Sequence, residues 1–434
     1  MMPTRTGSAD LPLHGGHVPM WLAQRMASLG RVIIEAVTHH YGRDEVLRRL
    51  AHPFWFQCFG AVMGMDWHSS GITTSVMGAL KRGLQPLQSE LGLYVCGGRG
   101  QHSRRTPAEL ALVGNRTGLD AAPLARASRL VAKVDSAAVQ DGYALYLHSF
   151  VVSAEGRWCV VQQGMNPSNR TARRYHWLSE RVTSFLDSPH AAIEGQPQGN
   201  IVNLADVRAA RCRNASLELV QAGPDRAVAV LRRLRECTQR NLNLFGHECL
   251  HGEDEGRIAQ DAAAHPHLQM PAHHDVRLSD VVLKRLHGTL AAAADRGPRD
   301  FPELLLAPGV GARTVAALAF VAEVVHGAPA RFSDPARFSL AHGGKDGHPF
   351  PVPLAVYDRT IRVLKDALAR AALGNHERLA AMQRLDQQAR ALERAARGPT
   401  LHAHAENERA RSHEYGGRTV LAAGPHATLR PLTH

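Results

Sequence analysis

The chain has 434 residues, enough for two or three domains, and 44% of them are hydrophobic, so a substantial core can form. Its net charge of +12 favours polyanionic partners such as nucleic acid, but the excess is spread along the chain and decides little alone. No run of about 18 apolar residues exists, which excludes a membrane-spanning helix, and residues 1–10 lack a signal-peptide core, so we expect a cytoplasmic protein, with the nucleoid as an alternative location.

The first 130 residues have mostly the periodicity of helices. Apolar residues recur at helical spacing over 19–39, and shorter helices are predicted at 44–50, 53–65 and 71–84. Pro53 is a helix-start signal. A short buried strand is predicted at 93–96, followed by a glycine turn, and a helix at 121–138 has Arg126, Arg129 and Lys133 on its exposed face.

The pattern then changes to the period of two that is typical of strands. Strands are predicted at 143–152 and 157–163, joined by a turn that ends in Gly156, with a third at 172–177. Helices follow at 205–240 and 279–294, the latter with Ser279 as its N-cap, and amphipathic helices are predicted at 355–372 and 376–397.

These elements predict an α+β fold that is predominantly helical. We expect an N-terminal helical domain with a small antiparallel sheet over 1–200, a helical connector over 201–297 with a loop insertion at 241–276, a third domain over 298–397 with a long C-terminal helix, and a disordered tail over 398–434. The six cysteines form no Cys-x-x-Cys pair, which argues against a zinc ribbon and favours reduced, buried thiols.

The third domain begins with a hairpin signal. Residues 301–327 have the sequence FPELLLAPGVGARTVAALAFVAEVVHG. We expect a short helix, a tight turn at 308–311 and a long apolar helix from Ala312, with Val310 turned inward to lock the two helices. Glycine at 309 and 311 permits positive φ and close approach. Unpaired amides at the start of the second helix form an anion site, and Arg313 lies one turn further on.

This segment resembles the helix-hairpin-helix of DNA repair and recombination proteins, and with the following ARFSDPARF it also resembles a region of certain bacterial transposases. The resemblance implies sequence-independent binding of the sugar-phosphate backbone of DNA, with RNA as an alternative partner. The residues predicted to make these contacts are Pro308, Gly309, Val310, Gly311, Ala312, Arg313 and Thr314. The alternative is an ordinary helical hairpin that binds no ligand.

Several N-terminal stretches contain acids, histidines and glycines together: TGSADLPLHGGHVP at 6–19, MGMDWHSSG at 63–71, LYVCGGRGQHSRR at 93–105, VDSAAVQDGYALYLH at 134–148 and VVQQGMN at 160–166. They resemble an uncharacterised prokaryotic family, domain-of-unknown-function family 763, over roughly residues 3–371. The resemblance implies an architecture but no activity.

Two groups of residues in these stretches are candidate sites for catalysis and for phosphate binding. Carboxylates with histidines suit a phosphodiesterase that uses Mg²⁺ or Mn²⁺, and the candidate catalytic residues are Asp10, His14, His17, Asp66, His68, Asp135, Asp141 and His148. A backbone nest for phosphate is predicted at Gly97, Gly98, Arg99, Gly100, Arg104 and Arg105. The alternatives are structural capping for the acids and histidines and a basic turn for the glycine-rich segment.

Two further motifs suggest other enzymes. His247-Glu248-Cys249-Leu250-His251 fits the His-Glu-x-x-His pattern of zinc peptidases, but Gly246 and Gly252 bracket it and shorten any helix. His273-His274-Asp275 is a separate metal-ligand candidate. Residues 349–362 resemble base-excision glycosylases, with Asp358 as their acid, but no catalytic lysine is evident.

Three functions therefore stay open from the sequence. The first is a DNA-processing or repair enzyme, for example a metal-dependent nuclease positioned by the hairpin. The second is a non-enzymatic DNA-binding or scaffold protein, and the third is a zinc peptidase. The oligomeric state is not predicted.

Overall fold

The structure is a computed structural model that describes residues 11–12, 20–63, 71–168, 171–195, 197–243 and 282–336, with residues 362, 365–366, 369, 379–381 and 383. Its centre is an antiparallel sheet in the order β1-β6-β5-β4-β2, with β7 paired to β6. The strands are β1 Leu11–Pro12, β2 Leu93–Arg99, β4 Ala144–Ser153, β5 Trp158–Asn166, β6 Thr171–Leu178 and β7 Ala192–Glu194.

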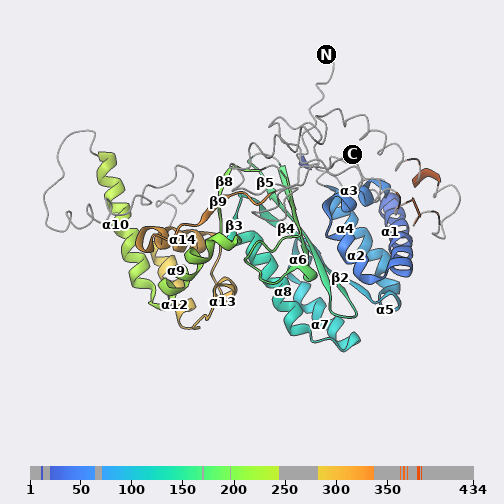
Figure 1. The fold of residues 1–434 in the computed structure, drawn as a ribbon, viewed down its shortest axis with the longest axis horizontal. Helices are drawn as coiled ribbons and strands as arrows, with labels where there is room; N and C mark the ends of the chain where they lie inside the picture. Colours follow the sequence, from blue (N-terminus) through green and yellow to red (C-terminus); the bar gives the residue numbers. More distant parts are fainter. Residues whose placement is uncertain are drawn as a thin grey trace, which may run out of the picture.

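Helices cover both faces of this sheet (Figure 1). One face packs against α1 Met20–Tyr41, α2 Arg43–Leu50, α3 Pro53–Val62 and α4 Gly71–Leu84. The other face packs against α7 Thr106–Thr117 and α8 Ala121–Lys133. Successive side chains of β5 point to opposite faces of the sheet, so that Trp158 and Val160 lie in one core and Cys159 and Val161 lie in the other.

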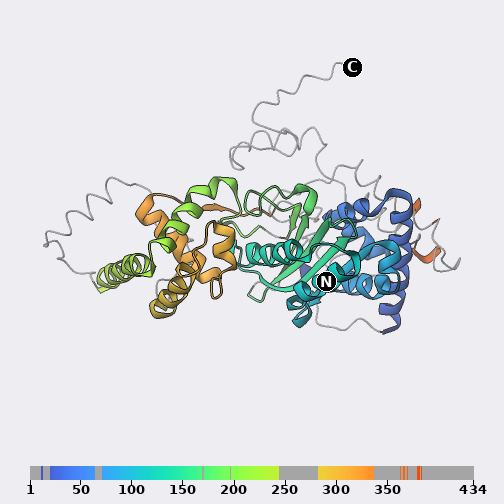
Figure 2. The ribbon, with the colours of Figure 1, turned by 90° about the horizontal axis from the view of Figure 1, so that it is seen from below.

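A second group of helices lies beyond α8, at the opposite end of the molecule from α1–α4 (Figures 1 and 2). It contains α9 Ala210–Gln221, α10 Pro224–Asn243, α12 Leu283–Ala294, α13 Phe301–Leu306 and α14 Ala312–His326. A small sheet, β3 Val139–Gln140, β8 Asn200–Asn203 and β9 Arg331–Ser333, joins this group to the rest. One buried cluster extends from Tyr94 to Ala330, so the core runs across the predicted boundary at 200.

Short elements complete the chain. They are η1 Gln85–Leu87, α5 Gln88–Leu91, α6 Gln101–Arg104, η2 Val134–Ala138, η3 Ser179–Arg181 and η4 Val207–Ala209. Helices α1–α4 and α8 and the β4–β5 hairpin lie where the sequence predicted them, whereas α7 was not predicted. Gly156 has φ 83° in the turn between β4 and β5, where Ser153 N–H donates to Arg157 O at 2.8 Å.

The predicted α+β class is confirmed, with several local differences. The helix predicted at 205–240 is divided into α9 and α10, and α12 has Val282 rather than Ser279 at its N-cap. The strand predicted at 93–96 continues to Arg99, because Gly97 lets β4 approach: a Cβ there would lie 2.2 Å from His148 O. The helix predicted at 121–138 changes at Val134 into a π-helix, which directs Asp135 into the core. The helices predicted at 355–372 and 376–397 and the tail lie largely outside the described residues.

Candidate nucleic-acid interface

Helices α13 and α14 are joined by a tight turn formed by residues 307–311, hereafter the α13–α14 turn. Asp300 caps α13 by accepting from Glu303 N–H at 2.7 Å. Gly309 has φ 83°, a conformation that favours glycine. Val310 N–H donates to Ala307 O at 3.2 Å, and the Val310 side chain is only 1% exposed. The prediction that Val310 turns inward is therefore confirmed.

The tip of the turn and the first turn of α14 face outward. Pro308, Gly309, Ala312 and Arg313 are exposed, whereas Thr314 is buried and the following residues of α14 pack into the core. Gly311, the N-cap of α14, provides no side chain to accept from the first amides of the helix. The amide groups at this end thus carry the positive pole of α14 at the surface.

Polar side chains from the preceding layer fix the position of the turn. Lys133 Nζ donates to Val310 O, and Gln140 Nε2 donates to Ala312 O at 3.0 Å. Burial lowers the pKa of the Lys133 amino group. On the other side, the Cβ that Gly309 lacks would lie 3.3 Å from Thr289 of α12. The carbonyl groups of Val310 and Ala312 are therefore occupied within the protein, which holds the turn and the start of α14 in place.

The helix that holds the turn is basic on its exposed face. Arg126 and Arg129 of α8 are exposed and lie two turns and one turn before Lys133. Helix α8 also packs against α13. Arg299 pairs with Glu303 at 2.6 Å, and this hydrogen bond lowers the pKa of Glu303 to about 2, helped by the charge of Arg126. The charge of Glu303 in α13 is thus compensated by Arg299 and Arg126.

Two of the predicted catalytic residues lie in one buried polar network. Asp135, which is fully buried, accepts hydrogen bonds from Trp177 Nε1 at 2.9 Å and from Gln162 Nε2, and its Oδ1 lies 2.5 Å from His190 Nε2. His148 joins the same network through Gln162 Oε1 at 2.6 Å. Burial lowers the pKa of His148, so the ring is neutral. These contacts connect η2, which follows α8, to strands β4, β5 and β6.

The third described candidate, Asp141, lies in a separate cluster. Its Oδ2 accepts from Tyr175 Oη at 2.6 Å and pairs with Arg173 at 2.9 Å. Arg173 also pairs with Asp334 at 2.7 Å, which joins β6 to the chain after β9. Although burial disfavours its charge, the two carboxylates raise the pKa of Arg173. Asp141 is thus part of a buried ion-pair network that connects β6 to the chain after β9.

The metal site predicted from these acids and histidines stays a prediction. Among the described residues, no group of three or more histidines, cysteines or acids is arranged to hold a metal ion. The other metal-ligand and catalytic predictions lie outside the described residues: Asp10, His14, His17, Asp66, His68, the His-Glu-x-x-His motif at 247–251, residues 273–275 and Asp358.

The glycine-rich segment is a strand end rather than an open loop. Gly97 N–H donates to Glu109 Oε2 and Gly100 N–H donates to Tyr146 O, both at 2.8 Å. Because these two amides are occupied, a phosphate nest at Gly97, Gly98 and Gly100 is not available there. Arg99, Arg104 and Arg105 are exposed, and phosphate contact by these side chains stays a prediction.

Sequence reasoning missed the residues that hold the turn in place. Gln140 follows a π-helix that has no signature in the helical period, and its contact with Ala312 spans 172 residues. His190 and Trp177, which complete the Asp135 network, come from β6 and the loop after it. Arg126 and Arg129 were visible as an exposed face, but their proximity to the hairpin was not.

The fold and its surface define a mixed protein with a helix-covered antiparallel sheet and an outward-facing helical turn. The chain belongs to the family described as "Protein of unknown function (DUF763)", whose model matches residues 7–352. Neither a curated protein nor a solved structure matches it. In the part of the chain that the structure describes, no helix is long and apolar enough to cross a membrane.

Proposed function

We propose that this protein binds DNA in DNA processing or repair, holding the sugar-phosphate backbone through the α13–α14 turn as a helix-hairpin-helix does. The observation that supports this most is the outward position of the uncapped first turn of α14. The partial positive charge of those amides attracts a phosphate, and the glycines let the backbone approach closely. Arg313 adds a charged donor at the same end.

The basic face of α8 extends this surface. Arg126, Arg129 and Lys133 recur at helical spacing, and Lys133 joins this face directly to the turn. Seven residues of helix span roughly 10 Å, enough to reach beyond one phosphate group. Because the Lys133 amino group is committed to Val310 O, we assign phosphate contacts to the two arginines and a positioning role to Lys133.

Such contacts predict binding that depends on salt but not on base sequence. The test is fluorescence anisotropy of labelled DNA, comparing two unrelated duplexes of equal length, a single strand and an RNA duplex over a salt series. We expect equal affinity for the two DNA duplexes and a linear decrease of log affinity with log salt. Absence of binding at low salt, or a strong preference between the two duplexes, would contradict the proposal.

The hypothesis of nuclease activity requires a separate experiment. Incubating the same DNA with Mg²⁺ or Mn²⁺, and with a chelator as control, distinguishes a DNA-cutting enzyme from a scaffold. Cleavage that the chelator stops would favour a metal-dependent nuclease, whereas binding without cleavage would favour a non-enzymatic DNA-binding protein.

A further inference from the structure

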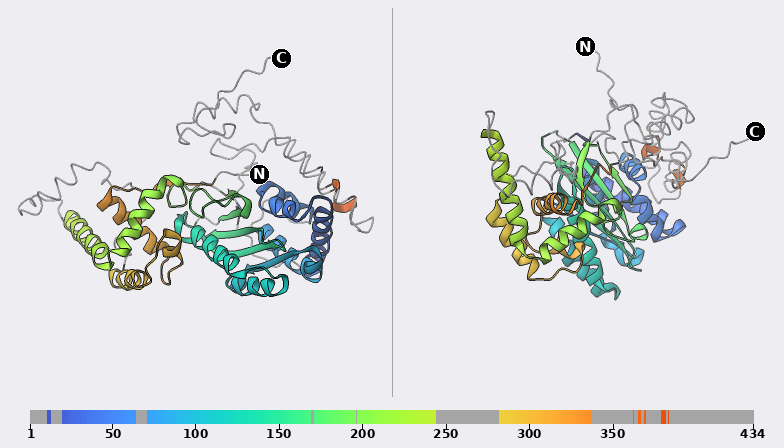
Figure 3. Two further views of the ribbon diagram at one scale, coloured as in Figure 1. Left: turned by 60° about the horizontal axis from the view of Figure 1, so that its bottom comes forward. Right: turned by 60° about the vertical axis from the view of Figure 1, so that its left-hand side comes forward.

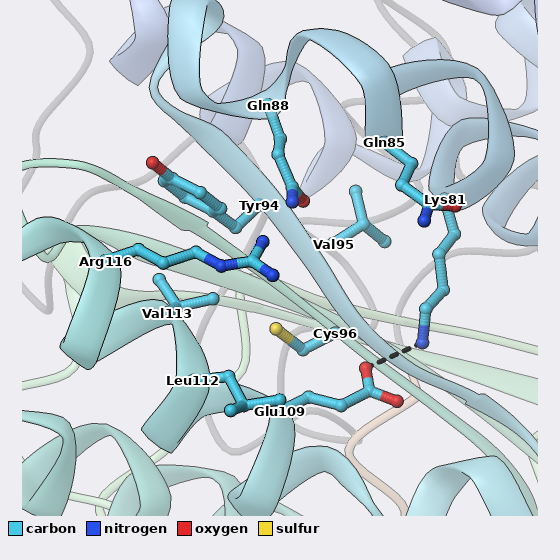
Figure 4. Close-up of a pocket in the computed structure, with 10 residues that line it drawn as sticks. All are labelled: Lys81, Gln85, Gln88, Tyr94, Val95, Cys96, Glu109, Leu112, Val113 and Arg116. Carbon is cyan, nitrogen blue, oxygen red and sulfur yellow. Dashed lines mark hydrogen bonds and ion pairs between the residues drawn. The ribbon is translucent and has the colours of Figure 1, made fainter.

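A groove of about 190 Å³ follows the outer edge of β2 (Figure 4). Tyr94, Val95 and Cys96 form its floor. One wall comes from the end of α4 with η1 and α5, and the other comes from α7. None of the residues that line this groove belongs to the proposed DNA-binding surface, so the groove is a separate candidate site.

The backbone of β2 points one set of hydrogen-bonding groups into this groove. Residues of even number bond to β4 or its extensions, since Gly100 N–H donates to Tyr146 O at 2.8 Å and Gly92 O accepts from Ala154 N–H at 2.9 Å. Antiparallel pairing alternates, so residues of odd number face away from β4. The N–H and C=O of Val95 therefore face the groove.

The end of this edge is closed by an ion pair. Gly97 N–H donates to Glu109 Oε2 at 2.8 Å, and Gly97 O accepts from Lys81 Nζ at 2.7 Å. Lys81 and Glu109 also bond each other at 2.6 Å, so their charges cancel. A strand edge that is protected at Gly97 but open at Val95 accepts only a short partner.

The walls add side chains that match a peptide. Figure 4 shows the Arg116 guanidinium lying across the groove from α7 and the Gln88 amide reaching in from α5. Leu112, a wall residue, is 57% exposed. With Lys81 and Glu109 cancelling, the charged lining residues sum to +1, which comes from Arg116. An amide edge, an apolar contact and one cation thus lie side by side.

We propose that this groove binds an extended peptide that pairs with Val95 as an added strand and places an acidic side chain on Arg116. Strand addition supplies affinity through main-chain hydrogen bonds, and alternate side chains supply selectivity. The charge of the groove selects an acidic partner, and Leu112 accommodates an apolar neighbour. The proposal is independent of DNA binding by the α13–α14 turn.

The test uses a fluorescent acetylated hexapeptide that alternates valine and glutamate, measured by fluorescence polarisation with the full chain. We expect the valine–glutamate peptide to bind saturably. A valine–lysine peptide should bind at least about tenfold more weakly. A valine–glutamate peptide with N-methylated backbone amides should not bind, because it cannot pair as a strand. Equal binding of the methylated peptide, or no saturable binding at millimolar concentration, would overturn the proposal.

Two variants locate the site. Val95→Pro removes the outward N–H of Val95 and breaks no bond to β4, and proline is tolerated at such a position of an edge strand. This variant should not bind the peptide. Arg116→Gln should weaken it about tenfold, whereas Arg82→Gln, an exposed arginine of α4 outside the groove, should leave it unchanged. Unchanged binding by Arg116→Gln would overturn the proposal even where Val95→Pro fails to fold. A dimer that Val95→Pro dissociates would instead identify a second copy as the occupant and overturn it too.

Discussion

Lys133, at the end of α8, donates a hydrogen bond from Nζ to the carbonyl oxygen of Val310, 177 residues further along the chain. This bond ties the α13–α14 turn to the helix that covers the central sheet. Figure 3 shows the α9–α14 group extending away from the sheet, so contacts of this kind determine where the turn lies. A turn that must present its amides to a rigid phosphate chain benefits from such a fixed position.

Removing this contact should weaken both the fold and the proposed binding. Lys133→Met keeps most of the apolar stem but leaves Val310 O without its donor, and should lower the free energy of unfolding by about 1–2 kcal/mol. Urea denaturation measures this. Arg126→Met, a change on the exposed face of the same helix, is the control and should stay within about 0.5 kcal/mol of the parent. Equal stability of both variants would show that the Lys133 contact contributes nothing.

The two exposed arginines of α8 should affect the salt dependence of DNA binding. If Arg126 and Arg129 each contact a phosphate, the double change to glutamine should reduce the slope of log affinity against log salt by about 1.8 for B-form DNA. Anisotropy titrations at several salt concentrations give the slope. The control is Arg82→Gln on α4. The slope could be unchanged in the double variant while substitution of the α13–α14 turn still weakens binding. That result would show that the turn contacts DNA and that α8 does not.

Asp135 should behave as a structural residue. Asp135→Ala leaves buried donors of Gln162 and Trp177 without their acceptor, so the free energy of unfolding should fall by about 3 kcal/mol or more. Asp120→Ala, which removes only the N-cap bond to Ala122 N–H, should cost about 1 kcal/mol. Chemical denaturation of the two variants makes the comparison. Full stability of Asp135→Ala, combined with loss of an activity, would restore the catalytic interpretation of Asp135.

Buried histidines make the fold sensitive to acid. Burial and the charge of Arg174 hold the pKa of His176 well below 6.5, so the folded state keeps this ring neutral while the unfolded chain takes up a proton. Stability is therefore complete above about pH 6.5 and decreases as the pH falls below it, by up to about 1.4 kcal/mol per pH unit for this residue. His176→Gln should flatten the decrease between pH 6.5 and 5 in denaturation measurements. An identical pH profile would show that His176 does not contribute.

The sequence predicted most of the long elements of this fold, with the exception of α7, but not its short strands. Helices α1 and α4 and strands β4 and β5 carry an apolar period over many residues, and α14 is a long apolar run, which are strong local signals. Strands β3, β7, β8 and β9 have two to four residues each, too few to show a period. They form because partners far away in the chain complete their pairing.

The candidate site shows the same division. The turn at 308–311 was predictable because glycine and proline determine backbone conformation locally. The roles of Asp135, Asp141 and His148 were not, since carboxylates and imidazoles suit both catalysis and buried hydrogen-bond networks. Their partners Gln162, Arg173 and Trp177 lie on neighbouring strands, and only tertiary structure brings them together.

The most direct measurement of the central claim compares two substitutions at the N-cap of α14. Gly311 has φ −141° and no atom within 4 Å of an added Cβ, whereas Gly309 has φ 83° and faces Thr289, so Gly311 is the site where charge can be changed without strain. Asp and Asn cap helices about equally well and differ here mainly in charge.

Gly311→Asp should therefore bind duplex DNA about tenfold more weakly than Gly311→Asn at low salt, with equal thermal stability of the two proteins and a difference that shrinks as salt increases. That result would place a phosphate at the first turn of α14. Equal affinity of the two variants for DNA, at equal stability, would contradict the proposed interface.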